Sequence, residues 1–142
     1  MTITRTQADA ISGYLQRIGF QGHIFDPNDH DESVHRIPIP SAQPFWIFSF
    51  KPAISPRVIN GGNMFTYGVA ADSFDAIVTS RPVDHLACLY QGMRTLKKDG
   101  LVLLCVEDSI GAGDRALFAK LNVSYLDIVI PKILVGRFRG GA

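Results

Sequence analysis

Three groups of residues have side chains and a spacing that could carry out chemistry. The first is a run of histidines and carboxylates between residues 23 and 35, since neutral imidazole and carboxylate are plausible ligands for a first-row metal ion. None of the usual ligand spacings occurs in it, so a solvated loop and a pH-sensitive interface are alternatives. A small metal-dependent enzyme that uses this segment is therefore one of the alternative functions. The members of the run are His23, Asp26, Asp29, His30, Asp31, Glu32 and His35.

The second group follows an apolar segment that ends at Thr79. In one interpretation Asp84 and His85 face a substrate, with His85 as general base and Arg81 binding an anion. In the other, Asp84 lies in the first turn of a helix, where its charge is favourable for the helix dipole. Asp84 and His85 are our first two candidate catalytic residues.

The third group is Glu107, Asp108 and Ser109, directly after a run over residues 101–106 that is apolar at every position. Carboxylates at the end of a strand are well placed for a cation or for hydroxyls of a ligand. Successive side chains of a strand point to opposite faces, so at most one of the two is expected to face a given ligand. Glu107 is our third catalytic candidate, and an acidic segment that opens a following helix is the alternative.

Aromatic residues between positions 45 and 67 form a further candidate surface. Their default role is core packing, and the alternative is a flat wall for an adenine ring or a sulfonium, since cations favour ring faces. The two cysteines, Cys88 and Cys105, sit inside apolar runs without a metal-binding spacing, which favours reduced and buried thiols. The aromatic residues are Phe45, Trp46, Phe48, Phe50, Phe65 and Tyr67.

The elements that must position these residues follow from hydrophobic periodicity. Five prolines between residues 37 and 58 exclude a long helix there, whereas strands and helices alternate regularly from residue 74 onward. This pattern predicts a single α/β domain over residues 1–142, with a Rossmann-like, mostly parallel sheet, helices on its faces and an antiparallel C-terminal strand pair. We expect helices over 5–18 (stopped by Gly19), 83–97 and 112–121, and strands over 23–25, 45–50, 64–70, 74–79, 101–106, 125–130 and 133–138.

Three segments in the second half of the chain resemble a known family. They are Phe74-Asp75-Ala76-Ile77-Val78, Leu96-Lys97-Lys98-Asp99-Gly100 with the following Leu101-Val102-Leu103-Leu104, and Ile133-Leu134-Val135-Gly136-Arg137. Strands and turns of this kind are similar to the back half of class I S-adenosylmethionine-dependent methyltransferases. The resemblance covers about half of the chain, residues 74–138. It implies a Rossmann-like fold with S-adenosylmethionine as cofactor and, if the protein is an enzyme, methyl transfer.

The resemblance also implies where the cofactor lies. It places the ligand at the carboxyl ends of the strands that end near Thr79 and Val106, so Thr79 and Ser80 are candidate cofactor-binding residues. The family holds its cofactor with a glycine-rich turn after the first strand, and no GxGxG occurs in this chain. Gly61-Gly62 is taken as the candidate for this turn. Asp72 is the candidate carboxylate for the ribose hydroxyls.

Composition narrows the choice of partners. Of the 142 residues, 46% are hydrophobic and 19% charged, and the net charge is +1, so nothing indicates nucleic acid or an anionic membrane as a partner. No signal peptide and no apolar run long enough to span a membrane is recognisable, which favours a cytoplasmic protein. The low charge suggests that another subunit covers apolar surface. A homo-oligomer, or a non-catalytic α/β subunit or assembly module, is therefore the alternative to a small-molecule-binding methyltransferase.

Overall fold

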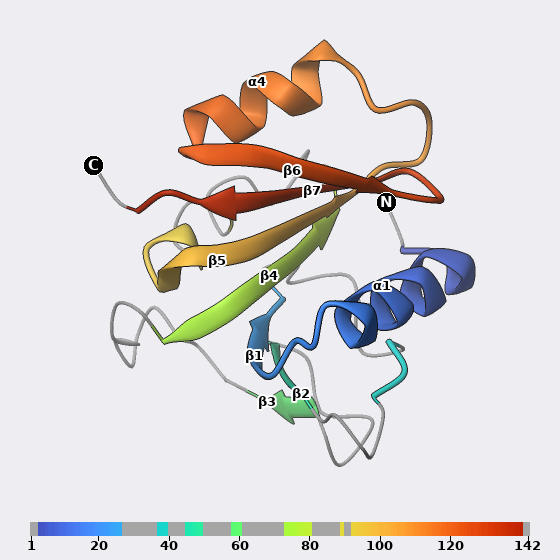
Figure 1. Ribbon diagram of the computed structural model, residues 1–142, viewed down its shortest axis with the longest axis vertical. Coiled ribbons are helices and arrows are strands. Elements are labelled where there is room, and N and C mark those ends of the chain that lie inside the picture. The colour runs from blue at the N-terminus through green and yellow to red at the C-terminus, as the bar shows by residue number, and fades with distance from the viewer. Residues whose placement is uncertain are drawn as a thin grey trace.

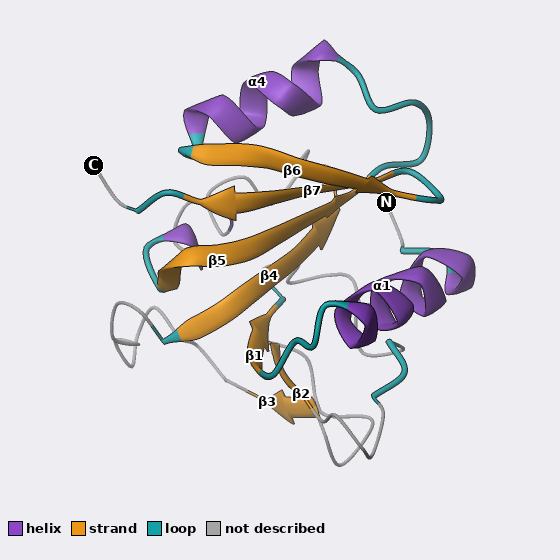
Figure 2. Cartoon of the chain, viewed as in Figure 1, coloured by secondary structure: helices purple, strands orange, loops and turns teal. Residues whose placement is uncertain are grey.

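A computed structural model of the chain describes residues 3–26, 37–39, 45–49, 58–60, 73–80, 89 and 92–140. Within this part the chain forms one seven-stranded sheet with helices packed against it (Figures 1 and 2). The helices are α1 (Arg5–Arg17) and α4 (Ala112–Lys120), and the strands are β1 (Gly22–Phe25), β2 (Phe45–Ser49), β3 (Val58–Asn60), β4 (Phe74–Ser80), β5 (Leu96–Cys105), β6 (Val123–Val129) and β7 (Ile133–Phe138).

The strand order confirms the predicted fold. It is β3-β2-β1-β4-β5-β7-β6, in which the first five strands are parallel to their neighbours. β7 runs antiparallel between β5 and β6. Parallel neighbours such as β4 and β5 need a long crossover connection, whereas the short turn at Pro131 and Lys132 allows only an antiparallel pair. The result is a mostly parallel α/β sheet with an antiparallel C-terminal pair.

α1 covers one face of this sheet. It begins with a capping box: the Thr4 hydroxyl accepts the backbone N–H of Gln7, and the Gln7 side-chain oxygen accepts that of Thr4, each at 3.1 Å. Its apolar side buries Ile11 and Leu15 completely in the core. The helix ends before Gly19, whose φ of 72° is in the left-handed region that favours glycine. The predicted N-terminal helix and its glycine stop are confirmed.

The second half of β5, from Gly100 to Cys105, is buried at every position. Leu101, Leu103 and Cys105 pack in the core beneath α1, whereas Val102 and Leu104 pack in the core on the opposite face. A strand that is covered on both faces needs apolar residues at every position instead of alternation. The unbroken apolar run in the sequence therefore correctly indicated a strand that is covered on both faces.

The opposite face is covered by α4 and by a helical segment with Leu89, Gly92 and Met93 among its described residues. Phe118 of α4 and both apolar side chains of the helical segment are buried in this core. A Cβ added to Gly92 would lie 2.6 Å from the ring of Phe25. The glycine therefore lets the helical segment approach β1 more closely than any other residue would.

The structure corrects one boundary in the second half of the chain. The sequence favoured a helix through residue 97 with a stop at Asp99-Gly100, but β5 already begins at Leu96. The pairing of β5 with β4 shifts register between Leu96 and Leu101, so the strand contains a bulge. Asp99 lies in this bulge with a φ of 66°. The interpretation of Asp99-Gly100 as a helix stop is therefore wrong, because these residues form an irregularity inside a strand.

Further differences lie near the edges of the sheet. β3 was not predicted, because Asn60 was assigned to a turn, and β6 begins two residues earlier than expected. Cys105 is buried, as expected. Cys88 and the predicted strand over 64–70 lie outside the described residues. Neither of the described helices is long and apolar enough to cross a membrane.

Candidate ligand-binding site

The carboxyl ends of β1 and β4 form a topological switch point. The two strands are parallel neighbours, with Ile24 opposite Ala76 and Phe25 opposite Ile77. After β1 the chain builds β2 and β3 on one side, and after β4 it builds β5 on the other side. In open α/β sheets the connections diverge at such a point, and ligands bind outside the carboxyl ends of the strands there. The topology therefore places the preferred ligand position beyond β1 and β4.

Three polar side chains are buried at this position. Asp26 directly follows β1 and is 0% exposed, and Thr79 and Ser80, the last residues of β4, are each 1% exposed. The Thr79 hydroxyl donates a hydrogen bond to the carbonyl oxygen of Ser80 at 3.0 Å. Buried polar groups are costly unless they are hydrogen-bonded, so three of them at the ends of neighbouring strands are a concentrated polar feature. The sequence predicted Thr79 and Ser80 for this place.

Asp26 is the residue that the sequence interpretation assigned to a different role. It was considered only as a member of the run of histidines and carboxylates, because a four-residue strand before it gives a weak signal. The informative feature was an acidic residue directly after the apolar pair Ile24-Phe25. Only the strand order shows that this pair lies at the centre of the sheet, next to β4. Asp26 thereby becomes the buried carboxylate at the switch point.

The described members of the histidine–carboxylate run lie at opposite ends of β1. The backbone N–H of His23 donates to Asp75 at 2.9 Å, and its exposed ring lies 4.0 Å from the same carboxylate. Asp26 is three residues farther along the strand, which corresponds to about 10 Å. No group of three or more metal-ligating side chains occurs within the described ranges. The rest of the run, from Asp29 to His35, lies outside them.

Glu107 lies at the same edge of the sheet as Ser80. Cys105, the last residue of β5, pairs with Ser80, and the chain continues directly to Glu107. The Glu107 backbone is fixed to the turn between β6 and β7, because its carbonyl oxygen accepts a hydrogen bond from the Lys132 ammonium at 2.7 Å. Its side chain is exposed. The structure thus brings this catalytic candidate to the carboxyl edge with a carboxylate that reaches solvent.

The first turn of α1 is attached to this edge. The side-chain amide of Gln7, which is 2% exposed, donates to the carbonyl oxygens of Val106 at 3.0 Å and Pro131 at 3.3 Å. Figure 1 shows the first turn of α1 at the end of the sheet toward which the arrowhead of β4 points. One buried glutamine therefore joins α1, β5 and the β6–β7 turn.

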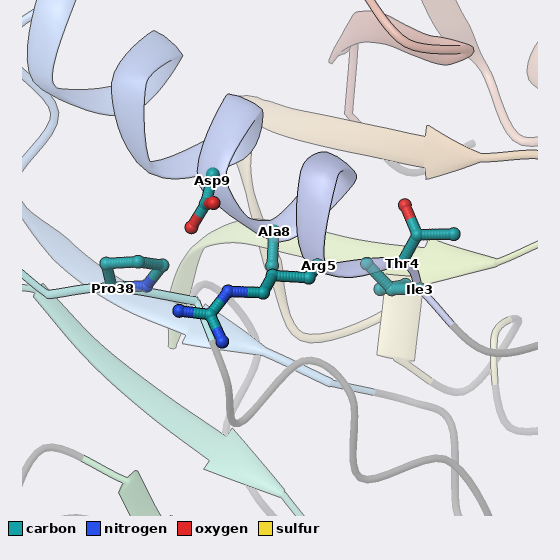
Figure 3. Close-up of a pocket in the computed structure, with 6 residues that line it drawn as sticks. All are labelled: Ile3, Thr4, Arg5, Ala8, Asp9 and Pro38. Carbon is teal, nitrogen blue, oxygen red and sulfur yellow. The ribbon is translucent and has the colours of Figure 1, made fainter.

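A cavity of about 370 Å³ lies beside this first turn, between α1 and residues 37–39 (Figure 3). Ser12 of α1 holds that segment by donating to the carbonyl oxygen of Pro38 at 2.6 Å. Most of its lining comes from the first turns of α1, which Gln7 attaches to the carboxyl edge, so the cavity lies toward the same edge as Asp26. Its lining residues are Ile3, Thr4, Arg5, Ala8, Asp9 and Pro38.

The remaining site residues predicted from the sequence lie outside the described residues. They follow or precede elements that are described: two come after β3, one precedes β4, and two come after β4. Their roles stay predictions. They are the glycine pair Gly61 and Gly62, the carboxylate Asp72, and the catalytic candidates Asp84 and His85.

A sheet with this strand order and an antiparallel seventh strand inserted between β5 and β6 has the fold of class I S-adenosylmethionine-dependent methyltransferases. The resemblance noted over residues 74–138 thus extends to the fold of nearly the whole chain. No family model matches the sequence, and a search of curated proteins finds no match.

Several solved structures with a similar fold are methyltransferases of different kinds. A 1,6-didemethyltoxoflavin-N1-methyltransferase of Burkholderia thailandensis, with bound S-adenosylhomocysteine, has a TM-score of 0.60 at 12% identity, over 95% of this chain and 80% of that one. A candidate methyltransferase of Methanococcus maripaludis has a TM-score of 0.58 at 13% identity, over 94% and 85%. A 16S rRNA methyltransferase of T. thermophilus has a TM-score of 0.53 at 14% identity, over 93% and 39%. At these identities the likeness concerns the fold.

Proposed function

We propose that this protein binds S-adenosylmethionine, or a related nucleoside, at the switch point between β1 and β4 and positions it for methyl transfer. The observation that carries the proposal is the buried carboxylate of Asp26 at the end of β1, beside Thr79 and Ser80 at the end of β4. A nucleoside offers hydroxyls and an amino group to such acceptors, and the strand order favours a ligand at this point.

The residues at this position would bind such a ligand with polar side chains rather than with backbone N–H groups. A carboxylate accepts hydrogen bonds from ribose hydroxyls or from an ammonium group, and a hydroxyl both donates and accepts. Residues 27–36 after β1 contain no glycine, so the close backbone approach of a glycine-rich turn is not available there. Asp26, Thr79 and Ser80 would therefore hold the cofactor by their polar groups.

When bound, S-adenosylmethionine supplies an electrophilic methyl group on a positively charged sulfur. Such a transfer needs mainly positioning of the acceptor atom in line with the sulfur–carbon bond, and little acid–base help. Glu107 is exposed at the same edge and is placed to accept a proton from an acceptor as it reacts. Asp84 and His85 are the other residues we propose for orienting the acceptor.

Calorimetric titration with S-adenosylmethionine and S-adenosylhomocysteine tests the proposal directly. We expect both to bind with one site per chain. Adenosine alone should bind more weakly, because it lacks the amino-acid portion. If neither S-adenosylmethionine nor S-adenosylhomocysteine binds at millimolar concentration, the proposal is wrong.

A second candidate function, a non-catalytic subunit that self-associates, is favoured by β6. This strand is the edge of the described sheet, and it exposes large apolar side chains together with the turn that follows it. They are Tyr125 (55% exposed), Leu126 (41%), Ile128 (39%) and Ile130 (84%). Exposed apolar residues that gather on one edge mark an interaction surface more often than scattered ones do.

The partner proposed for this edge is a second copy of the chain. Tyr125 pairs with Gly136 and Ile128 with Leu134, two positions apart on β7, so both side chains lie on the same face. In an antiparallel pairing about a twofold axis, Tyr125 of each copy would meet Ile128 of the other. Light scattering should then give a dimer that Ile128→Lys converts to monomer. A monomeric wild-type protein would exclude this candidate.

A further inference from the structure

The cavity beside α1 is lined by two charged side chains of opposite sign. Arg5 and Asp9 both line it and both are exposed. Within the described part of the chain, neither side chain makes an ion pair or a hydrogen bond. Figure 3 shows both extending from α1 toward Pro38.

Their failure to pair with each other has a physical reason. They are four residues apart on one helix, a spacing at which ion pairs form, but the favourable order has the acidic residue nearer the N-terminus. Here the cation comes first. Arg5 also stands in the first turn, which holds no acidic residue, so the positive end of the helix dipole adds to its charge instead of offsetting it. The guanidinium therefore remains available to an anion from outside.

Apart from Thr4, the other lining residues of the cavity are apolar and held in place by the fold. Ile3 is 2% exposed and Ala8 is 1% exposed, so both form a fixed floor in the core, and Pro38 is held to α1 by the hydrogen bond from Ser12. A volume of about 370 Å³ is near the lower end for small-molecule sites, which span roughly 300–1,000 Å³. The helix end itself is already capped by Thr4, so it is the side chains and the cavity that recognise the ligand.

From these features we infer that the cavity binds a small zwitterion of the α-amino-acid type with an apolar side chain. Arg5 holds the carboxylate in a bidentate pair, Asp9 accepts hydrogen bonds from the ammonium, and the apolar wall contacts the side chain. The inference is independent of the proposed adenosyl site, because it concerns different residues. If both are correct, the zwitterion lies at the same edge of the sheet as the methyl donor.

Three related probes test the two charges separately. L-phenylalanine carries both groups, 3-phenylpropionate only the carboxylate, and phenethylamine only the ammonium. Each is titrated into the full chain and followed by NMR shifts of the backbone amides of Arg5 and Ala8. We expect L-phenylalanine to bind at least tenfold more tightly than either single-charge probe, since each unmatched charge loses about 1.4 kcal/mol or more.

Charge-neutral variants assign each contact. Arg5→Gln should weaken L-phenylalanine and 3-phenylpropionate at least tenfold and leave phenethylamine unchanged. Asp9→Asn should weaken L-phenylalanine and phenethylamine at least tenfold and leave 3-phenylpropionate unchanged. Arg94→Gln is the matched control, because Arg94 is exposed, lines neither cavity described here and should leave all three affinities unchanged.

The same titrations in saturating S-adenosylhomocysteine separate this inference from the proposed function. Binding of L-phenylalanine with no binding of S-adenosylhomocysteine would support the zwitterion site and remove the adenosyl site. If L-phenylalanine does not bind at millimolar concentration, the inference is wrong. It is also wrong if Arg5→Gln weakens S-adenosylhomocysteine and L-phenylalanine competes with it, because the cavity would then belong to the amino-acid end of the cofactor.

Discussion

We call the end of the sheet where the parallel strands begin the amino edge and the end where they stop the carboxyl edge. A cavity lies at each of them, and the two cavities differ in whether their charged side chains are paired. At the amino edge, a cavity of about 270 Å³ includes Asp75, Lys97, Asp99 and Arg137 among its lining. The Lys97 ammonium lies 2.9 Å from the carboxylate of Asp75, and the Arg137 guanidinium donates to the carbonyl oxygen of Asp99 at 3.0 Å. At the carboxyl edge, Arg5 and Asp9 have no such partner in the described part of the chain.

This difference distinguishes charged side chains that stabilise the fold from charged side chains that we expect to bind a ligand. At the amino edge, charged groups join neighbouring strands: Asp75 of β4 contacts His23 of β1 and Lys97 of β5. At the carboxyl edge, Gln7 and Lys132 hold backbone carbonyls, and the buried polar groups gather at the switch point. Among the described residues, Arg5 and Asp9 at the carboxyl edge thus differ from the paired charges of the amino edge, and we expect a polar ligand at the carboxyl edge.

The largest effect expected is on cofactor binding at the switch point. Asp26→Asn should lower the affinity for S-adenosylhomocysteine roughly 10- to 100-fold, because hydrogen bonds to a charged group contribute about 1.5–3 kcal/mol. Calorimetry measures the loss. Asp75→Asn at the amino edge is the matched control and should leave the affinity unchanged. Equal losses in both variants would mean that the two edges do not differ in ligand binding.

A smaller effect is expected on stability when the carboxyl edge loses its buried link. Gln7→Leu should reduce the free energy of unfolding by about 1–3 kcal/mol, because it removes the hydrogen bonds to Val106 and Pro131. Urea denaturation gives the value. Gln21→Leu, at the exposed amino edge, should change stability by no more than about 0.5 kcal/mol.

A third prediction compares a paired carboxylate with a free one. Asp75→Ala removes the ion pair with Lys97 and the hydrogen bond from the backbone N–H of His23. Because the site is partly exposed, we expect the free energy of unfolding to fall by only about 0.5–1 kcal/mol. Asp9→Ala should stay close to the wild-type free energy of unfolding. A larger loss for Asp9 than for Asp75 would contradict the assignment of structural and ligand-binding charges.

The smallest effect concerns pH. Burial raises the pKa of Tyr14 above its ordinary 10.0, and the charge of Asp127 raises it further, against opposing effects of Arg137 and Arg17. The folded state therefore retains the phenol proton more tightly than the unfolded state. This stabilisation is complete below pH 10 and is lost as pH rises through the folded pKa. Tyr14→Phe should show a shallower decline of stability with pH above 10, and an unchanged decline would refute this.

The second half of the fold was predictable from the sequence because its signals are local. β7 has the predicted bounds, and β4, β5 and α4 lie where apolar runs and helical spacing put them. The first half was harder. β3 has only three residues, from Val58 to Asn60, and so gives no periodicity. The sequence placed Thr79, Ser80 and Glu107 at the carboxyl ends of strands because they end or follow recognisable strands, whereas Asp26 follows a strand too short to be recognised as central.

The zwitterion cavity could not have been predicted in the same way. Arg5 and Asp9 are ordinary polar positions of an amphipathic helix when only their spacing is known. Their lack of partners, and the nearness of Pro38 from a different segment, depend on how α1 docks on the sheet. A spacing of four residues allows a pair, but the order with the cation nearer the N-terminus is the weaker of the two.

The sequence by itself determined the fold class, because apolar periodicity and turn residues act within a few positions of the chain. It also predicted the ends of the two strands near the site, at Thr79 and Val106, to within one residue of their observed ends at Ser80 and Cys105. Only the tertiary structure decided which strand lies beside β4, and hence that Asp26 is the buried acid of the switch point. Strand order depends on crossovers and burial between distant segments, and no local pattern in the chain contains that information.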